Sequence, residues 1–92
     1  MTNEDLTKLK VDYIKRNIEY WVSELIKKQD ALLFLENRLE GLSKLKKLTE
    51  EEKKLKETEH PANIENCKFD IEKAEVHIEN LRSMMEAYTK QS

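Results

Sequence analysis

Apolar residues recur with a heptad period along the first half of the chain. From Val11 onward they occupy the a and d positions, with Lys28 as the one interruption. This pattern is typical of an amphipathic helix that packs as in a coiled coil. Thr2 followed by Asp5 resembles a helix N-cap with its acidic third position, so we predict a long helix over about 3–48. The heptad residues are Val11, Ile14, Ile18, Trp21, Leu25, Leu32, Leu35, Leu39 and Leu42.

The pattern changes in the segment GLSKLKKLTEEEKKLKETEHP, where charged residues surround each leucine. Thr49 with Glu52 fits a capping box, which predicts a break or kink near residue 48 and a short polar helix over about 49–58. A continuous helix through Gly41, at a cost of ~1 kcal/mol, is the alternative. Pro61 disfavours helical geometry in the preceding residue and suits a first helical position, so the last helix is predicted over about 61–89.

The predicted last helix carries a heptad pattern without a charged interruption, from Ile64 to Tyr88. If the chain reverses between residues 49 and 60, this helix packs against the first one. We therefore predict an all-α fold: one domain, residues 1–92, built as an antiparallel, coiled-coil-like helical hairpin with the short polar helix near the turn. Its expected core is Trp21, Leu25, Leu32 and Leu35 with Ile71, Ile78 and Leu81.

Composition agrees with an all-helical chain. Of the 92 residues, 39% are charged and 38% hydrophobic, and glycine and proline occur once each. The longest apolar run, ALLFL, is too short to cross a bilayer, and MTNEDLTKLK lacks the apolar core of a signal peptide. Cys67 has no second cysteine to pair with. These features lead us to expect a cytoplasmic protein that does not enter the membrane.

The first helix has more apolar surface than one partner helix covers. Its apolar side chains span an arc of about 140°, wider than an a/d seam. In the expected register its first turns also extend beyond the last helix, which predicts a homodimer packed as a four-helix bundle. A helix from another protein, or a chain folded back into three helices, would be the alternatives. The predicted self-association residues are Val11, Ile14, Ile18, Trp21, Val22, Leu25 and Ile26.

A second contact surface is indicated on the back faces of the two long helices. Phe69 and Val76 lie seven residues apart, opposite the heptad seam of the last helix, and Tyr20 and Phe34 lie outside the main arc of the first. Aligned apolar groups on an otherwise polar face are typical of a binding surface. We predict that these four residues contact another protein.

Residues suited to catalysis or to metal and nucleic-acid binding show no matching pattern. Of the metal-ligand types, His60, Cys67 and His77 stand alone, and Cys67 and His77 lie on nearly opposite faces of one helix. The basic stretches KLKK and KKLK are separated by EEE, and the net charge is −2. We therefore predict no catalytic, cofactor or metal site, and no nucleic-acid partner.

The function predicted from these features is that of a non-enzymatic interaction module, an adaptor, chaperone-like cofactor or regulator. One alternative is a small phage or mobile-element inhibitor that blocks a host nuclease or defence enzyme. A second is a small dimeric enzyme, because the order of long, short and long helices resembles that of the helical chorismate mutases. That resemblance implies a dicarboxylate bound by inward-facing arginines, and Arg16, Arg38 and Arg82 are the arginines present.

Overall fold

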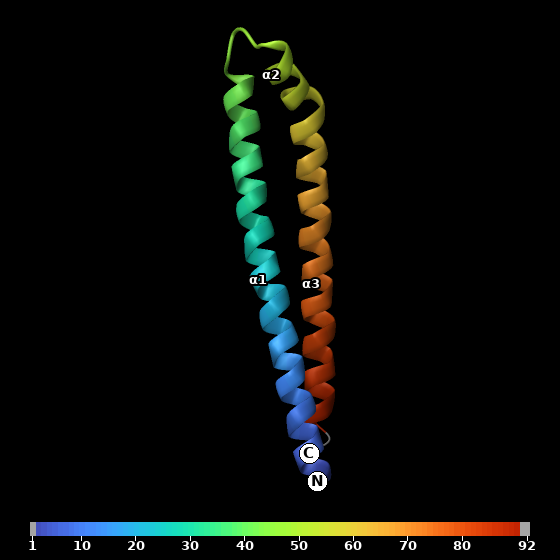
Figure 1. Ribbon diagram of the computed structural model, residues 1–92. Helices are drawn as coiled ribbons and strands as arrows, with labels where there is room; N and C mark the ends of the chain where they lie inside the picture. Colours follow the sequence, from blue (N-terminus) through green and yellow to red (C-terminus); the bar gives the residue numbers. More distant parts are fainter. Residues whose placement is uncertain (1, 91–92) are drawn as a thin grey trace. The chain divides into compact units, whose positions relative to one another are not determined.

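The computed structural model describes residues 2–90, and all of its regular elements are helical (Figure 1). They are α1 (Asn3–Ser43), α2 (Glu50–Lys54), a π-helical turn (Leu55–Glu59) and α3 (His60–Lys90). No strand occurs within these described residues. The all-α prediction is therefore confirmed.

Local hydrogen bonds set both ends of α1. At its start, the Asp5 amide donates to Thr2 Oγ1 at 3.2 Å and the Thr2 amide donates to Asp5 Oδ2 at 3.3 Å, as the sequence predicted. At its end, the amides of Lys44 and Leu45 donate to the carbonyls three residues earlier, at 3.2 and 3.3 Å. Such tight bonds close a helix. The helix thus passes Gly41 and ends at Ser43, and the predicted end near residue 48 is wrong.

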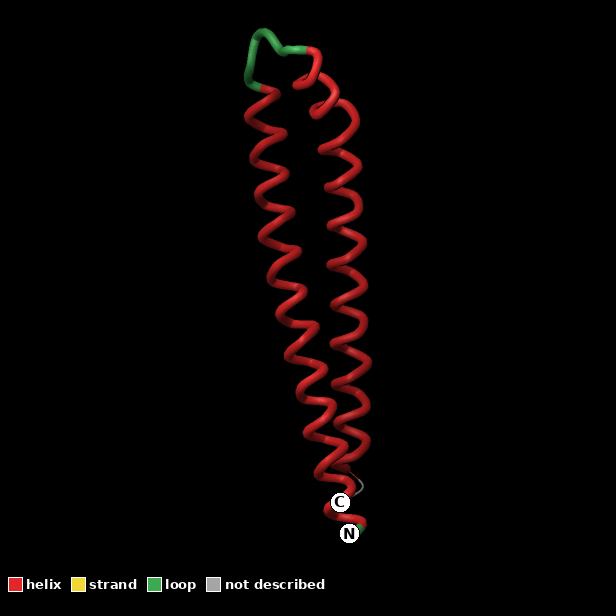
Figure 2. Tube along the Cα trace, in the orientation of Figure 1, coloured by secondary structure: helices red, strands yellow, loops and turns green. Residues whose placement is uncertain are grey.

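The loop after α1, coloured green in Figure 2, leads to a capped helix start. Thr49 has extended backbone angles, and the Glu52 amide donates to its Oγ1 at 3.1 Å. The Thr49 amide donates in turn to Glu52 Oε1 at 3.0 Å. This is the predicted capping box, and it starts α2 at Glu50.

Pro61 does not interrupt the helix, in contrast to the prediction of separate helices over 49–58 and 61–89. The backbone of His60 is helical, with φ −63° and ψ −45°, and its amide donates to the carbonyl of Leu55 five residues earlier. A proline ring would clash with the carbonyl four residues before it, which here belongs to Glu57. The wider π turn directly before Pro61 explains how the helical path continues from α2 into α3.

The chain forms two compact units. Unit 1 comprises Met1–Leu25 with Glu72–Ser92, and unit 2 comprises Ile26–Ile71. Both α1 and α3 contribute to each unit. The single domain over residues 1–92 stays a prediction.

In unit 1 the two helices run antiparallel. Lys10 lies over the ring of Tyr88 at 5.5 Å, and further along α1 Trp21 stacks on His77, which lies earlier in α3. Ile14 is 4% exposed, so the prediction that α1 extends uncovered past the last helix is wrong. The chain reverses earlier than the predicted residues 49–60. Because α1 ends at Ser43 and not near residue 48, α3 reaches the first turns of α1.

In unit 2 an interhelical ion pair accounts for the interruption of the heptads. Lys28 Nζ lies 3.3 Å from Asp70 Oδ2, with both side chains partly exposed. Lys28 therefore occupies its heptad position beside an acidic residue of α3. An exposed pair of this kind contributes about 0–1 kcal/mol, so it adds little to the stability of the unit.

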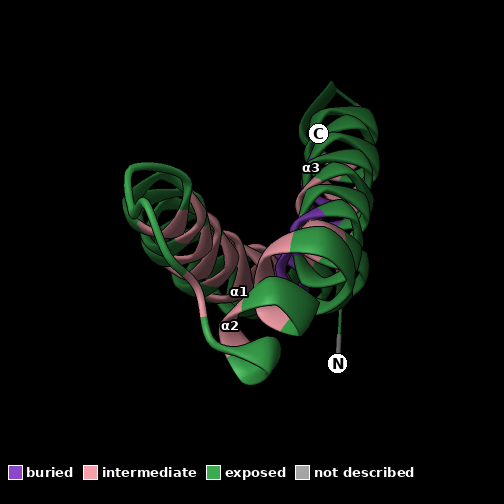
Figure 3. Ribbon diagram, turned by 90° about the horizontal axis from the view of Figure 1, so that it is seen from above, coloured by how far each residue is buried: buried purple, intermediate pink, exposed green. Residues whose placement is uncertain are grey.

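The buried residues are few and most belong to α3, as the purple segments of Figure 3 indicate. Of the predicted core, Ile78 is buried. The other six predicted core residues are half-buried. Among residues 2–90, the buried positions are Ile14, His60, Ile64, Ala74 and Ile78.

Candidate interaction surface

The predicted self-association residues differ widely in exposure. Ile14 is buried against its own unit, and Ile26 is 54% exposed. The other five are half-buried: Val11, Ile18, Trp21, Val22 and Leu25. Of the predicted set, Ile26 is therefore the one residue with most of its surface open to a second molecule.

A further apolar residue accompanies Ile26 in unit 2. Leu33 lies seven residues later on α1, hence on the same helical face, and is 62% exposed. We call these two residues the α1 stripe. Their spacing is one heptad, the repeat of a helix–helix seam.

The four predicted partner-contact residues are all exposed. Tyr20 and Val76 belong to unit 1, whereas Phe34 and Phe69 belong to unit 2. Tyr20 packs edge-on against Trp21 with ring centroids 5.3 Å apart, and Arg38 lies 5.5 Å from the Phe34 ring centroid. Each is accessible to another protein, and the common partner face stays a prediction.

The histidine at position 77 has a packing role that the sequence did not indicate. Its ring stacks on Trp21 with centroids 4.4 Å apart and planes 19° apart. Glu75 and Glu79 flank His77 two residues away on either side, and the stacking partner comes from the other helix, so sequence position alone gave no signal.

An apolar groove of about 430 Å³ lies on unit 1. On α1 its wall is formed by Leu6, Leu9 and Tyr13, whose spacing of three and four residues aligns them on one helical face. All three are exposed, as is Met84 on α3. Within its lining Lys10 is the charged residue. The full lining is Leu6, Leu9, Lys10, Tyr13, Ile14, Asn17, Leu81, Met84 and Tyr88.

A second groove on unit 1, of about 590 Å³, has a different character. Glu75, Glu79 and Glu86 line it from α3, with Arg82 as the single basic residue. We call it the acidic groove. Val22, Leu25 and Ile78 also line the acidic groove, so its carboxylates flank apolar side chains, whereas no carboxylate lines the apolar groove.

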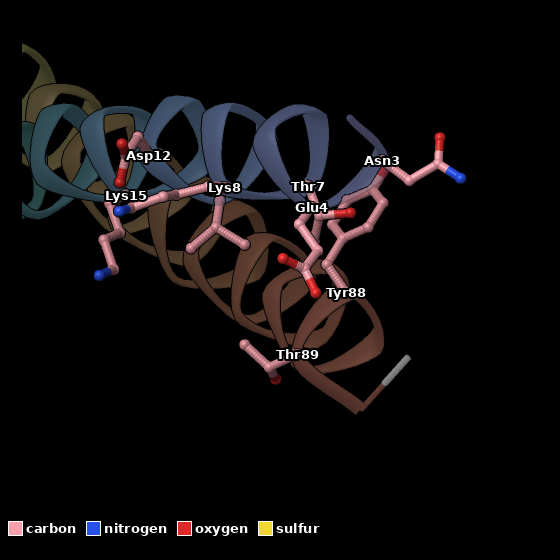
Figure 4. A pocket seen from close by; sticks show the side chains of 9 residues that line it. Asn3, Glu4, Thr7, Lys8, Asp12, Lys15, Tyr88 and Thr89 are labelled. Carbon is pink, nitrogen blue, oxygen red and sulfur yellow. The ribbon is translucent and has the colours of Figure 1, made fainter. Parts of the chain in front are cut away.

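Near the start of α1, a third hollow of about 630 Å³ is lined mainly by polar groups (Figure 4). The side chains of Glu4, Lys8, Asp12 and Lys15 come from α1, and Tyr88 and Thr89 come from α3. Acidic and basic groups alternate here without a histidine or cysteine. This arrangement offers solvated charges and no nucleophile–base pair.

Metal-ligand residue types are not brought together in the part of the chain that the structure describes. Across residues 2–90 no three His, Cys, Asp or Glu side chains form a group that could hold a metal ion. Cys67 is half-buried with a free thiol. His60 is buried, and neither of its ring nitrogens has a hydrogen-bond partner among the described residues.

Comparison with protein-family models, curated proteins and solved structures gave no match. Over the described residues, no helix is both long and apolar enough to cross a bilayer.

Proposed function

We propose that this chain is a non-enzymatic helical interaction module that acts as a homodimer. The observation that supports it is the amount of surface left exposed. The chain exposes 7395 Å², whereas a globular protein of its 11.0 kDa mass exposes about 5,600 Å². The difference of about 1,800 Å² exceeds the ~800 Å² that each partner contributes to a standard interface.

The α1 stripe is the proposed self-association surface. Ile26 and Leu33 leave more than half of their area in contact with water, and covering a large apolar side chain gains up to ~1.5–3 kcal/mol. In a two-fold dimer the same stripe of the second copy supplies matching apolar groups. We infer that two helical hairpins pack through this surface as a four-helix bundle.

Light scattering after size exclusion tests this proposal at several protein concentrations. The dimer has a mass of about 22 kDa, twice the 11.0 kDa chain. Ile26→Lys with Leu33→Lys places two charges in the interface and is expected to give an 11.0 kDa species. The matched control, Asn63→Lys with Asn66→Lys, adds the same charge at exposed positions of α3 and is expected to remain dimeric.

Two results would contradict the proposal. One is a wild-type chain that stays monomeric at every concentration. The other is a dimer that persists in the Ile26→Lys, Leu33→Lys protein, because the interface would then lie elsewhere.

A further inference from the structure

We propose that the apolar groove of unit 1 binds an acidic amphipathic helix from another protein. This inference deepens the proposed interaction function and concerns a surface separate from the α1 stripe. Leu6, Leu9 and Met84 all lie outside the heptad seams, so the sequence pattern did not indicate them as binding residues.

The form of the groove favours a helix as its occupant. Leu6, Leu9 and Tyr13 lie along one face of α1, and Leu81, Met84 and Tyr88 line the groove from α3. An amphipathic helix places apolar anchors three, four and seven residues apart into a channel of this kind. Leu9 and Met84 are 51% and 47% exposed, so they have area left to bury on such a partner.

The charged residues around the groove favour a partner helix that carries negatively charged side chains. Lys10 lines it directly. Arg16 is exposed and lies three residues after Tyr13 and seven after Leu9, which places it along the same face of α1. Asp5, four residues before Leu9, also lies on this face, but its carboxylate is engaged in the N-cap of α1, where Oδ2 accepts from the Thr2 amide at 3.3 Å. No carboxylate lines this groove, whereas three glutamates line the acidic groove of the same unit. Glutamates or aspartates beside the apolar anchors would therefore be attracted to the rim.

The same charges disfavour a second copy as the occupant. A two-fold contact through this groove would bring Lys10 and Arg16 of one copy towards those of the other. Like charges placed across an interface oppose association. A two-fold dimer is thus better accommodated by the α1 stripe, and the groove is left for a different chain.

Two designed peptides test the proposal on the full-length protein. Both carry leucines at helical spacing on one face, one with glutamates flanking them and the other with lysines in their place. Fluorescence anisotropy of the labelled peptides measures Kd, and we expect the glutamate peptide to bind at least about tenfold tighter. Because the protein has a net charge of −2, attraction by overall charge would favour the lysine peptide instead.

Substitutions locate the binding. Leu9→Ser with Met84→Ser removes apolar area without adding charge and is expected to weaken binding about tenfold or more. Arg16→Glu is expected to reduce the preference for the glutamate peptide several-fold, and more at low salt than at high salt. The matched control, Glu75→Gln with Glu79→Gln, alters the acidic groove and is expected to leave Kd unchanged.

Each other outcome overturns the inference. Equal binding of the two peptides, tighter binding of the lysine peptide, or no binding of either would contradict it. A loss of dimer mass in the Leu9→Ser, Met84→Ser protein would instead assign the groove to a second copy. Light scattering of the Ile26→Lys, Leu33→Lys protein tests the dimer, whereas peptide anisotropy tests the groove. The two proposals can therefore fail independently of each other.

Discussion

The two units are held together in different ways. Unit 1 buries three apolar residues, Ile14, Ala74 and Ile78, beside the stacked rings of Trp21 and His77. Unit 2 buries Ile64 and the imidazole of His60, which has no partner for either nitrogen among the described side chains. The buried residues are thus all apolar in unit 1, whereas unit 2 also buries a polar ring.

This difference has a thermodynamic meaning. Burying apolar groups favours folding, whereas a buried polar group without a hydrogen bond costs about 1–3 kcal/mol. Unit 2 also contains the loop, the capping box and the π turn, where the helix depends on local hydrogen bonds. We infer that unit 2 opens more readily than unit 1, which amide hydrogen exchange can measure.

The largest expected effect comes from truncating Ile14, one of the two buried isoleucines of unit 1. Ile14→Ala should lower the free energy of unfolding by about 2–4 kcal/mol, because it deletes buried methyl groups and leaves a cavity. Urea denaturation monitored by circular dichroism measures the change. The matched control is Ile18→Ala, at a half-buried site of the same helix. If both substitutions lowered the free energy of unfolding equally, Ile14 would not be more buried than Ile18, contrary to the structure.

A smaller effect of opposite sign is expected in unit 2. His60→Leu replaces the unpartnered ring with an apolar side chain of similar size and should raise the free energy of unfolding by about 1–2 kcal/mol. His77→Leu is the comparison, because that ring stacks on Trp21 and its removal should not stabilise the protein. Destabilisation by His60→Leu would mean that the imidazole makes a hydrogen bond in solution.

The smallest expected effect concerns the cap of α2. Thr49→Ala removes the oxygen that accepts from the Glu52 amide and should destabilise the protein by about 1 kcal/mol. Thr49→Ser keeps that oxygen and is expected to stay within a few tenths of the wild-type value. The same urea titration distinguishes them, and equal midpoints for the alanine and serine proteins would exclude a stabilising cap.

Features governed by neighbouring residues could be predicted from the sequence. The capping boxes at Thr2 and Thr49 each depend on residues three positions apart, and both are present. The heptad pattern likewise placed Ile78 in the core. Short-range hydrogen bonding and helical periodicity act within a few residues, so they can be read directly from the sequence.

Features that depend on where the chain turns could not be predicted. No proline and no glycine with a positive φ angle marks the end of α1 at Ser43. Proline usually ends a helix, but the π turn before Pro61 lets the helix continue. Because the reversal was placed too late, Ile14 was expected to be uncovered. The apolar groove was missed since Leu6 and Leu9 precede the heptads that begin at Val11. Their spacing with Tyr13 was the available signal.

The midpoint of thermal unfolding as a function of protein concentration tests the central claim most directly, namely that a second copy covers exposed apolar surface. A homodimer is stabilised by mass action, so we expect Tm to rise steadily over a wide concentration range. The Ile26→Lys, Leu33→Lys protein should lose this dependence. A wild-type Tm that is the same at every concentration would show that folding does not involve a second copy, and would contradict the account.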